Sequence, residues 1–157
     1  MQNTKGTIAF GADHAGFAMK NELMSFLKNE GYAVVDHGAF NSNPDDDYPD
    51  FVTKVAREVS RHPDTLRGIV LGGSGNGEAV VCNRFPSVRA AVYYGGNVEI
   101  VSLSREHNDA NILSLGARFV DIEEAKMVVL KWLNTKFSED ERHIRRIQKI
   151  DNLYDQF

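Results

Sequence analysis

Short apolar runs alternate along this chain with longer segments in which apolar residues recur at helical spacing. The runs are rich in β-branched or aromatic residues and cover residues 7–10, 32–36, 68–71, 88–93 and 111–115. The helical segments lie between the first two runs, at 48–61, 78–84 and 97–106, after Asp121, and at 139–153. Strands that alternate with helices favour right-handed crossovers and a parallel sheet covered on both faces. The pattern therefore predicts a three-layer, doubly wound, Rossmann-like α/β fold with a five-stranded parallel sheet and an extended C-terminal helix.

Three helix boundaries carry signals of their own. Asp121 followed by Glu124 is typical of a capping box, which predicts that a helix begins there. Pro49 stands near the first-turn position that tolerates proline, and Gly31 stands where the first helix should end. These signals agree with the boundaries that the apolar spacing indicates.

The composition favours one compact domain over residues 1–157. Of these residues 42% are hydrophobic and 25% are charged, and no repeat or linker divides them. With 22 acidic and 18 basic residues the formal net charge is -4, so we expect no nucleic-acid and no membrane partner. The first apolar run is too short for a signal peptide, and no stretch approaches the ~18 apolar residues of a membrane span. Cys82 is the only cysteine, which excludes a disulfide within the chain and favours a reducing, cytoplasmic environment.

A glycine-rich loop, Gly72-Gly73-Ser74-Gly75-Asn76-Gly77-Glu78, follows the third predicted strand and leads into a helix. Glycines allow backbone N–H groups to approach an anion closely, and the helix N-terminus adds partial positive charge. Such a loop can bind a phosphate or hold an oxyanion formed during a reaction, and the alternative is a tight turn without a ligand. It lacks the Gly-Lys-Ser/Thr ending of a P-loop and the G-x-G-x-x-G spacing, which argues against ATP and dinucleotides.

Acidic and imidazole side chains stand near the same predicted sheet edge. Glu78 either complements the helix dipole or acts as a general base, and a base needs a pKa above the usual value for Glu. Asp13 and His14 follow the first strand, and the carboxyl ends of parallel strands are where ligands bind in such folds. The acidic triplet at 45–47 is typical of a solvated turn.

Two further groups lie elsewhere in the chain. His107 and Asn108 precede the fifth strand, at the edge opposite Glu78, so they need not share a pocket with it in one subunit, and a partner subunit could bring them together. Arg142 and Arg146 share one helical face, which indicates either a solvated basic face or a small phosphorylated ligand. No His-x-x-x-His or Cys-x-x-Cys pair is present, so the sequence predicts no metal and no cofactor.

Taken together, these segments resemble the type B ribose-5-phosphate isomerases, a family that includes the galactose-6-phosphate isomerase subunits. The segments that carry the resemblance are 11–16, 47–49, 72–78, Asn83, 105–111 and 142–146. The resemblance implies a homodimer or higher homo-oligomer with shared sites and a metal-independent interconversion of ribose 5-phosphate and ribulose 5-phosphate through an enediolate. Many members carry a catalytic Cys where this chain has Gly72, and the loop is similar to the subgroup in which the Glu, here Glu78, is the base.

The resemblance also implies roles for individual residues. Glu78 is the base, Ser74 assists proton exchange and His107 opens the sugar ring. The residues that it implies contact the substrate are Asp13, His14, Tyr48, Gly73, Gly75, Asn76, Gly77, Asn108, Arg118, Arg142 and Arg146. Arg118, Arg142, Arg146 and His14 are the phosphate ligands among them.

Two alternatives stay open at the level of sequence. An isomerase of a hexose 6-phosphate, such as galactose or allose 6-phosphate, fits the same residues, and the loop at 41–46 would set the pocket length. A non-catalytic phosphosugar-binding module is also compatible with the fold. Glu78, Ser74 and His107 argue against that module, because binding alone needs none of them.

Overall fold

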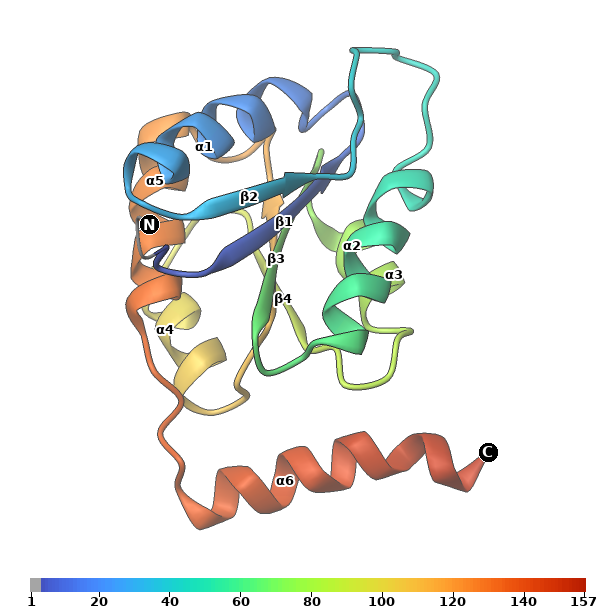
Figure 1. Ribbon diagram of the computed structural model, residues 1–157, viewed down its shortest axis with the longest axis vertical. Helices are drawn as coiled ribbons and strands as arrows, with labels where there is room; N and C mark the ends of the chain where they lie inside the picture. The colour runs from blue at the N-terminus through green and yellow to red at the C-terminus, as the bar shows by residue number, and fades with distance from the viewer. Residues whose placement is uncertain (1–3) are drawn as a thin grey trace.

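The computed structural model describes residues 4–157 and, within them, one parallel sheet of five strands (Figure 1). The strand order is β2-β1-β3-β5-β4, and every neighbouring pair is parallel. The strands are β1 (Thr7–Ala12), β2 (Ala33–Asp36), β3 (Leu66–Gly72), β4 (Ala90–Tyr93) and β5 (Ile112–Gly116). The predicted sheet is confirmed, and each strand overlaps its predicted range.

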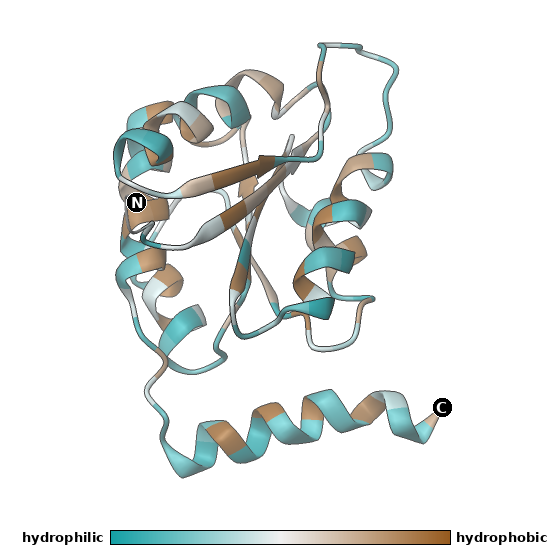
Figure 2. Ribbon diagram, in the orientation of Figure 1, coloured by the Kyte–Doolittle hydropathy of each residue, from teal (hydrophilic) through white to brown (hydrophobic). Residues whose placement is uncertain are grey.

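Helices cover both faces of the sheet. On one face lie α1 (Phe17–Asn29), α4 (Glu99–Glu106) and α5 (Ile122–Asn134), and on the other lie α2 (Pro49–Arg61) and α3 (Asn76–Cys82) (Figure 1). Each side has its own apolar cluster, one around Phe10, Leu113 and Trp132, and the other around Val55 and Val70. The brown strands in Figure 2 mark this apolar interior. The three-layer prediction is therefore confirmed.

The predicted helix start after Asp121 is confirmed, whereas α3, α4 and α6 (Glu141–Asp151) each begin two residues away from their predicted starts. Asp121 Oδ1 accepts a hydrogen bond from the Glu124 N–H at 2.8 Å, so α5 begins with a side-chain cap. Helix α3 begins at Asn76, two residues before the predicted start at 78. Gly75 has a φ of 81°, a left-handed conformation that turns the chain from β3 directly into the helix.

The C-terminal helix α6 (Glu141–Asp151) extends away from the layered body and continues into a short 3-10 helix, η1 (Asn152–Gln156) (Figure 1). Within α6 the structure buries only His143, so most of its apolar and basic side chains are exposed. No helix in residues 4–157 is long and apolar enough to cross a membrane.

Candidate active site

The chain diverges to opposite faces of the sheet after β1 and after β3, which are neighbours in it. Strand β1 leads to α1 on one face, and β3 leads to α3 on the other. A crevice forms outside the carboxyl ends of strands at such a switch point, and ligands of doubly wound folds bind there. Asp13 and His14 follow β1, and the loop from Gly73 to Glu78 follows β3, so both predicted segments border this crevice.

Neighbouring groups hold the glycine loop against β5. Ser114 Oγ donates to the carbonyl oxygen of Gly75 at 2.6 Å, and Ser74 Oγ accepts from the Asn76 N–H at 3.2 Å. The N–H of Gly77 is in the first turn of α3 and has no partner within the helix. The Gly77 N–H is therefore available to an oxyanion in the crevice, at the N-terminus of α3.

Glu78 lies beside this donor and is 3% exposed. Burial raises the pKa of its carboxyl group above the usual value, the Asp13 carboxylate raises it further, and the backbone N–H of Glu78 opposes the shift. This is the direction that a general base near neutral pH needs. Glu78 packs directly on Gly72, because a Cβ at that position would overlap Glu78 Oε1.

Two more predicted residues lie against the loop. The phenol oxygen of Tyr48 would be 2.6 Å from a Cβ on Gly77, so the ring and the glycine are in close contact. Arg118 follows β5, donates its N–H to the Gly73 carbonyl at 3.1 Å, and places Nη1 3.2 Å from the Cβ position of Gly73. Arg118 is exposed and offers a cation to a ligand in the crevice.

Asp13 and His14 are held by different partners. Asp13, 7% exposed, accepts through Oδ1 from the N–H groups of Ala15 at 3.0 Å and Gly16 at 3.4 Å. Asp46 Oδ1 accepts from the His14 N–H at 3.0 Å and from His14 Nδ1 at 2.7 Å. Within residues 4–157, Nδ1 is the His14 ring nitrogen that has a hydrogen-bond partner, which leaves Nε2 for a ligand.

The prediction of a solvated turn at 45–47 is wrong for Asp46. Its side chain is 9% exposed, and in the described part of the chain its Oδ2 is buried without a hydrogen-bond partner. Lys20, fully buried, holds the start of the loop that carries Asp46 by donating to Asp36 Oδ1 at 2.6 Å and to the Ala39 carbonyl at 2.8 Å. Nothing in the sequence distinguishes the middle residue of three aspartates.

Tertiary structure also groups three possible metal ligands that lie far apart in sequence. One ligand atom from each of Asp13, His14 and Asp46 lies within 4.8 Å of the others. His14 Nδ1 and Asp46 Oδ1 already bond each other, and Asp13 Oδ1 already accepts two backbone N–H groups. We therefore assign no ion to these side chains.

The remaining predicted residues lie at the opposite edge of the sheet. His107 is the C-cap of α4, and Asn108 follows it, before β5 begins at Ile112. The five residues of β5 separate this turn from the crevice by roughly 16 Å at ~3.3 Å per residue. Arg142 and Arg146 are exposed on α6, beyond this edge (Figure 1). One subunit thus places these four residues apart from Glu78.

A histidine that sequence reasoning missed lies beside His107. The rings of His107 and His143 are 4.4 Å apart between centroids, and His143 Nδ1 is 2.9 Å from Ser138 Oγ. Burial lowers the pKa of His143, and His107 and Arg142 lower it further. His143 therefore favours its neutral form and anchors α6 to the end of α4. No spacing in the sequence distinguishes it.

Cys82 does not join the site. It is fully buried, and burial followed by the nearby Glu78 charge raises the pKa of its thiol to about 12. The thiolate is the nucleophilic form of cysteine, so this side chain is held in its unreactive state. The sequence assigned it no chemistry.

Comparisons with known proteins identify the family of the chain. Residues 8–150 match the family model described as Ribose/Galactose Isomerase. Ribose-5-phosphate isomerase B of Mycolicibacterium paratuberculosis is 41% identical over 140 residues, which cover 89% of this chain and 86% of the relative. The corresponding Escherichia coli protein is 38% identical over 143 residues, 91% of this chain and 93% of the relative.

Two solved structures are similar over nearly all of the chain. Ribose-5-phosphate isomerase B from Mycoplasma genitalium, with bound ribulose-5-phosphate, has a TM-score of 0.93 at 33% identity and covers 99% of this chain and 100% of its own. The Clostridium thermocellum enzyme has a TM-score of 0.87 at 42% identity, covering 96% and 98%. The family match from residue 8 to 150, together with relatives about 40% identical over nearly the whole chain, shows that the chain belongs to the ribose/galactose isomerase family.

Proposed function

We propose that this chain is an aldose-ketose isomerase that interconverts D-ribose 5-phosphate and D-ribulose 5-phosphate through an enediolate, without a metal or cofactor. The observation that carries the proposal is the buried Glu78 carboxyl group, whose pKa is raised beside the N–H groups of the glycine loop. The names of the relatives and the ribulose-5-phosphate bound to the Mycoplasma genitalium protein support the choice of sugar.

The proposed proton transfer uses the groups at the switch point. Glu78 removes the proton from C2 of the open aldose and returns it to C1, while the charge that develops on oxygen is held by N–H groups near Gly75 and Gly77. Ser74 passes a proton between the two oxygens, so that O1 gains the hydrogen that O2 loses. No redox partner is needed, because one carbon is reduced as its neighbour is oxidised.

The other residues bind the substrate and prepare it. His107 acts as acid and base in opening the furanose ring, with Asn108 beside it. Arg118, Arg142, Arg146 and His14 hold the phosphate, which fixes the register of the reacting carbons. The remaining contacts to the sugar come from Asp13, Tyr48, Gly73 and Asn76.

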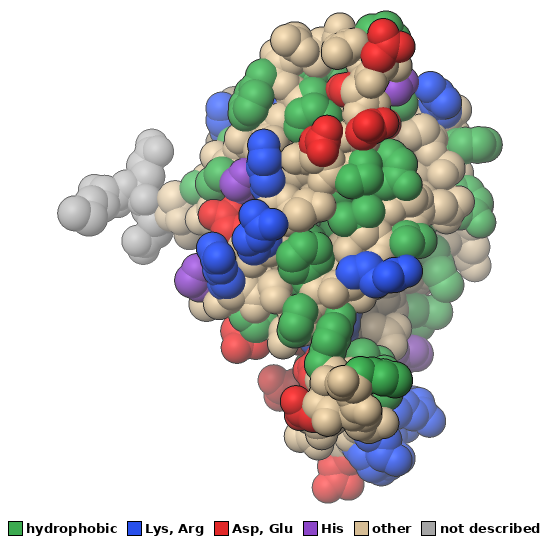
Figure 3. Space-filling model, turned by 90° about the vertical axis from the view of Figure 1, so that its right-hand side faces the viewer, with side chains coloured by type: hydrophobic (Ala, Val, Ile, Leu, Met, Phe, Trp, Pro, Cys, Tyr) green, Lys and Arg blue, Asp and Glu red, His purple; other side chains and the backbone are tan. Residues whose placement is uncertain are grey.

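A homodimer, or a higher homo-oligomer built from it, would complete the site. Glu78 and His107 lie at opposite edges of one subunit, and a two-fold axis can join one edge to the other twice. Helix α6 carries exposed apolar side chains, among them Ile144 and Ile150, and Leu153 and Tyr154 continue this surface in η1. In Figure 3 hydrophobic side chains run from the middle of one face toward the end of α6. An apolar cavity of about 440 Å³ separates this end from the body.

The pentose assignment has one close competitor within the family. The loop of residues 37–48 borders the crevice, and its exposed side chains include the acidic ones at the top of Figure 3. The length of this loop determines how long a sugar chain the crevice can hold. A hexose 6-phosphate, such as galactose or allose 6-phosphate, has one more carbon and is therefore the second candidate substrate. We assign the enzyme to the cytoplasm and to the pentose phosphate pathway, as one domain over residues 1–157.

The test combines a substrate panel with one substitution. The wild-type protein should interconvert ribose 5-phosphate and ribulose 5-phosphate with a higher kcat/KM than any hexose 6-phosphate pair. Glu78→Gln should keep substrate binding and lose at least about 10²-fold in kcat, because an amide cannot accept the proton. A higher kcat/KM for a hexose phosphate would move the assignment to that sugar. Binding without turnover in the wild type would indicate a phosphosugar-binding module.

A further inference from the structure

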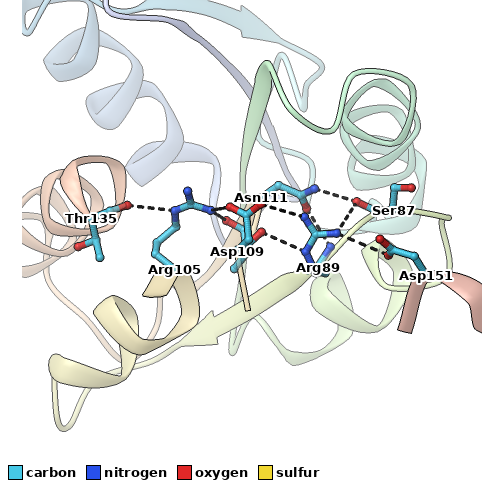
Figure 4. A network of polar contacts seen from close by, with 8 residues as sticks. Ser87, Arg89, Arg105, Asp109, Asn111, Thr135 and Asp151 are labelled. Atoms are coloured by element: carbon cyan, nitrogen blue, oxygen red, sulfur yellow. Dashed lines mark hydrogen bonds and ion pairs between the residues drawn. The ribbon is translucent and has the colours of Figure 1, made fainter. Parts of the chain in front are cut away.

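We propose that Asp109 is a positioning residue for ring opening: it is the carboxylate through which Arg89 and Arg105 fix the turn that carries His107 and Asn108. The proposal rests on the role assigned to His107 in the proposed function. Figure 4 shows the contacts around this turn, which tie α4, the start of β4, the start of β5 and the end of α6 together.

The backbone of the turn is in a conformation that needs support. Asp109 has a φ of 45°, in the left-handed region that few residues other than Gly, Asn and Asp adopt. Its N–H donates to the Arg105 carbonyl at 3.1 Å, and the His107 N–H donates to Leu103 at 3.0 Å. The direction in which His107 leaves the end of α4 therefore depends on whether residue 109 keeps this conformation.

Both arginines hold Asp109. Arg105 Nη1 donates to Asp109 Oδ1 at 2.7 Å, Arg89 Nη2 donates to Oδ2 at 3.4 Å, and Arg89 Nε donates to the Asp109 carbonyl at 3.1 Å. The same Arg105 Nη1 donates to the Ala110 carbonyl at 2.6 Å. Arg89 and Arg105 thus hold the Asp109 carboxylate and the backbone carbonyls of Asp109 and Ala110.

The arginines are themselves fixed. Arg105 is 4% exposed, and its Nε reaches the Thr135 carbonyl at 3.3 Å, at the start of the link to α6. Asn111 Oδ1 accepts a hydrogen bond from the Arg89 backbone N–H at 2.8 Å. Asp151 Oδ1, at the end of α6, lies 3.6 Å from Arg89 Nη1. Rigid partners of this kind are what a positioning group requires.

The negative charge of Asp109 also stabilises the turn, because positively charged arginines surround it. Burial lowers the pKa of Arg67. The charges of Arg105 and Arg89 lower the pKa of Arg67 further, and the charge of Asp109 raises it. Asp109 is therefore one of the anions near these arginines, with Asp64 near Arg67 and Asp151 near Arg89, and it is the one that contacts both Arg89 and Arg105. A variant that keeps the left-handed backbone but removes the carboxylate isolates this effect.

The experiment separates ring opening from proton transfer. Ribulose 5-phosphate is incubated in D₂O, and deuterium uptake at C1 of the remaining ketose is compared with formation of ribose 5-phosphate. Exchange needs enediolate formation and the replacement of the proton on Glu78 by solvent deuterium, whereas net isomerisation on the enzyme also needs ring closure. The equilibrium constant fixes the ratio of kcat/KM in the two directions, so a variant lowers both values by the same factor. Comparing the two directions therefore does not isolate ring opening, whereas comparing exchange with isomerisation does.

Asp109→Gly suits the φ of 45° and removes the carboxylate, and Asp109→Asn keeps an acceptor for Arg105 without the charge. We expect Asp109→Gly to lower net isomerisation about tenfold and Asp109→Asn less, with exchange within about twofold of wild type. Adding Asp109→Gly to His107→Asn should cause no further loss of isomerisation.

Tyr93→Phe is the control for a general loss of stability. It removes the bond from the buried Tyr93 hydroxyl to Glu124 at 2.7 Å, away from the turn, and should leave the ratio of exchange to isomerisation unchanged. All variants are compared below their melting temperatures, with circular dichroism as the check on folding.

The possible results distinguish the two proposals. If exchange and isomerisation fall together in folded Asp109→Asn and Asp109→Gly, or if neither falls, Asp109 does not act through His107. If His107→Asn itself lowers exchange as much as isomerisation, the ring-opening role of His107 in the proposed function fails, and the positioning role of Asp109 fails with it.

Discussion

Gly72→Ala should inactivate the protein through Glu78 rather than through the fold. Gly72 ends β3 and lies outside the left-handed region of φ, so alanine is compatible with its backbone. The new Cβ would overlap Glu78 Oε1 and lie 2.6 Å from Oε2, whereas ordinary contact begins near 3.4 Å. The carboxylate would have to retreat by about 1 Å or more, a displacement that costs about 10²-fold in rate. We therefore expect kcat to fall about 10²-fold while the secondary structure is retained.

The assay is a double-mutant cycle with Glu78→Asp, whose side chain is one carbon shorter. The shorter carboxylate already stands back from residue 72, so the added methyl group should cost little. The double variant should have nearly the kcat of Glu78→Asp alone, measured as ketose formation from ribose 5-phosphate. Losses that multiply, or a Gly72→Ala variant within about threefold of wild type, would refute the contact as the cause.

Three further outcomes test the remaining parts of the proposal. Mixing Glu78→Gln with the Arg142→Ala/Arg146→Ala variant under conditions of subunit exchange should restore part of the activity, since each mixed dimer holds one intact site; no recovery despite proven exchange would argue against a shared site. Glu78→Gln should raise the Tm at pH 7.5, because a folded-state pKa above the unfolded value means that the Glu78 charge opposes folding at neutral pH. That gain should shrink as the pH falls and vanish below about pH 4, under the unfolded value of 4.5, and a gain that grows toward acid would contradict the sign. Activity should survive chelators and brief iodoacetamide treatment, because burial raises the pKa of Cys82 to about 12; loss on chelation that one divalent ion restores would overturn the metal-free mechanism.

Local sequence pattern was sufficient to predict the strands and helices and to single out one segment of the candidate site. Alternating apolar runs and helical segments predicted all five strands, because burial on both faces of a sheet requires continuous apolar runs. Asp121 predicted the start of α5, because a cap is a contact over three residues. The glycine loop and Glu78 were recognisable for the same reason, since the donors and the base lie within one short segment.

Only the tertiary structure decided which distant side chains meet. Asp46 bonds His14 across 32 positions of sequence, and the His107 ring lies against His143 at the end of α6. The same is true of Gly72, whose missing side chain leaves room for Glu78. Periodicity reports which face of an element is buried, but it carries no information about which other element covers that face. The order of the strands and the path of the chain around them determine those contacts, and they bring α6 to the end of α4, where His143 meets His107.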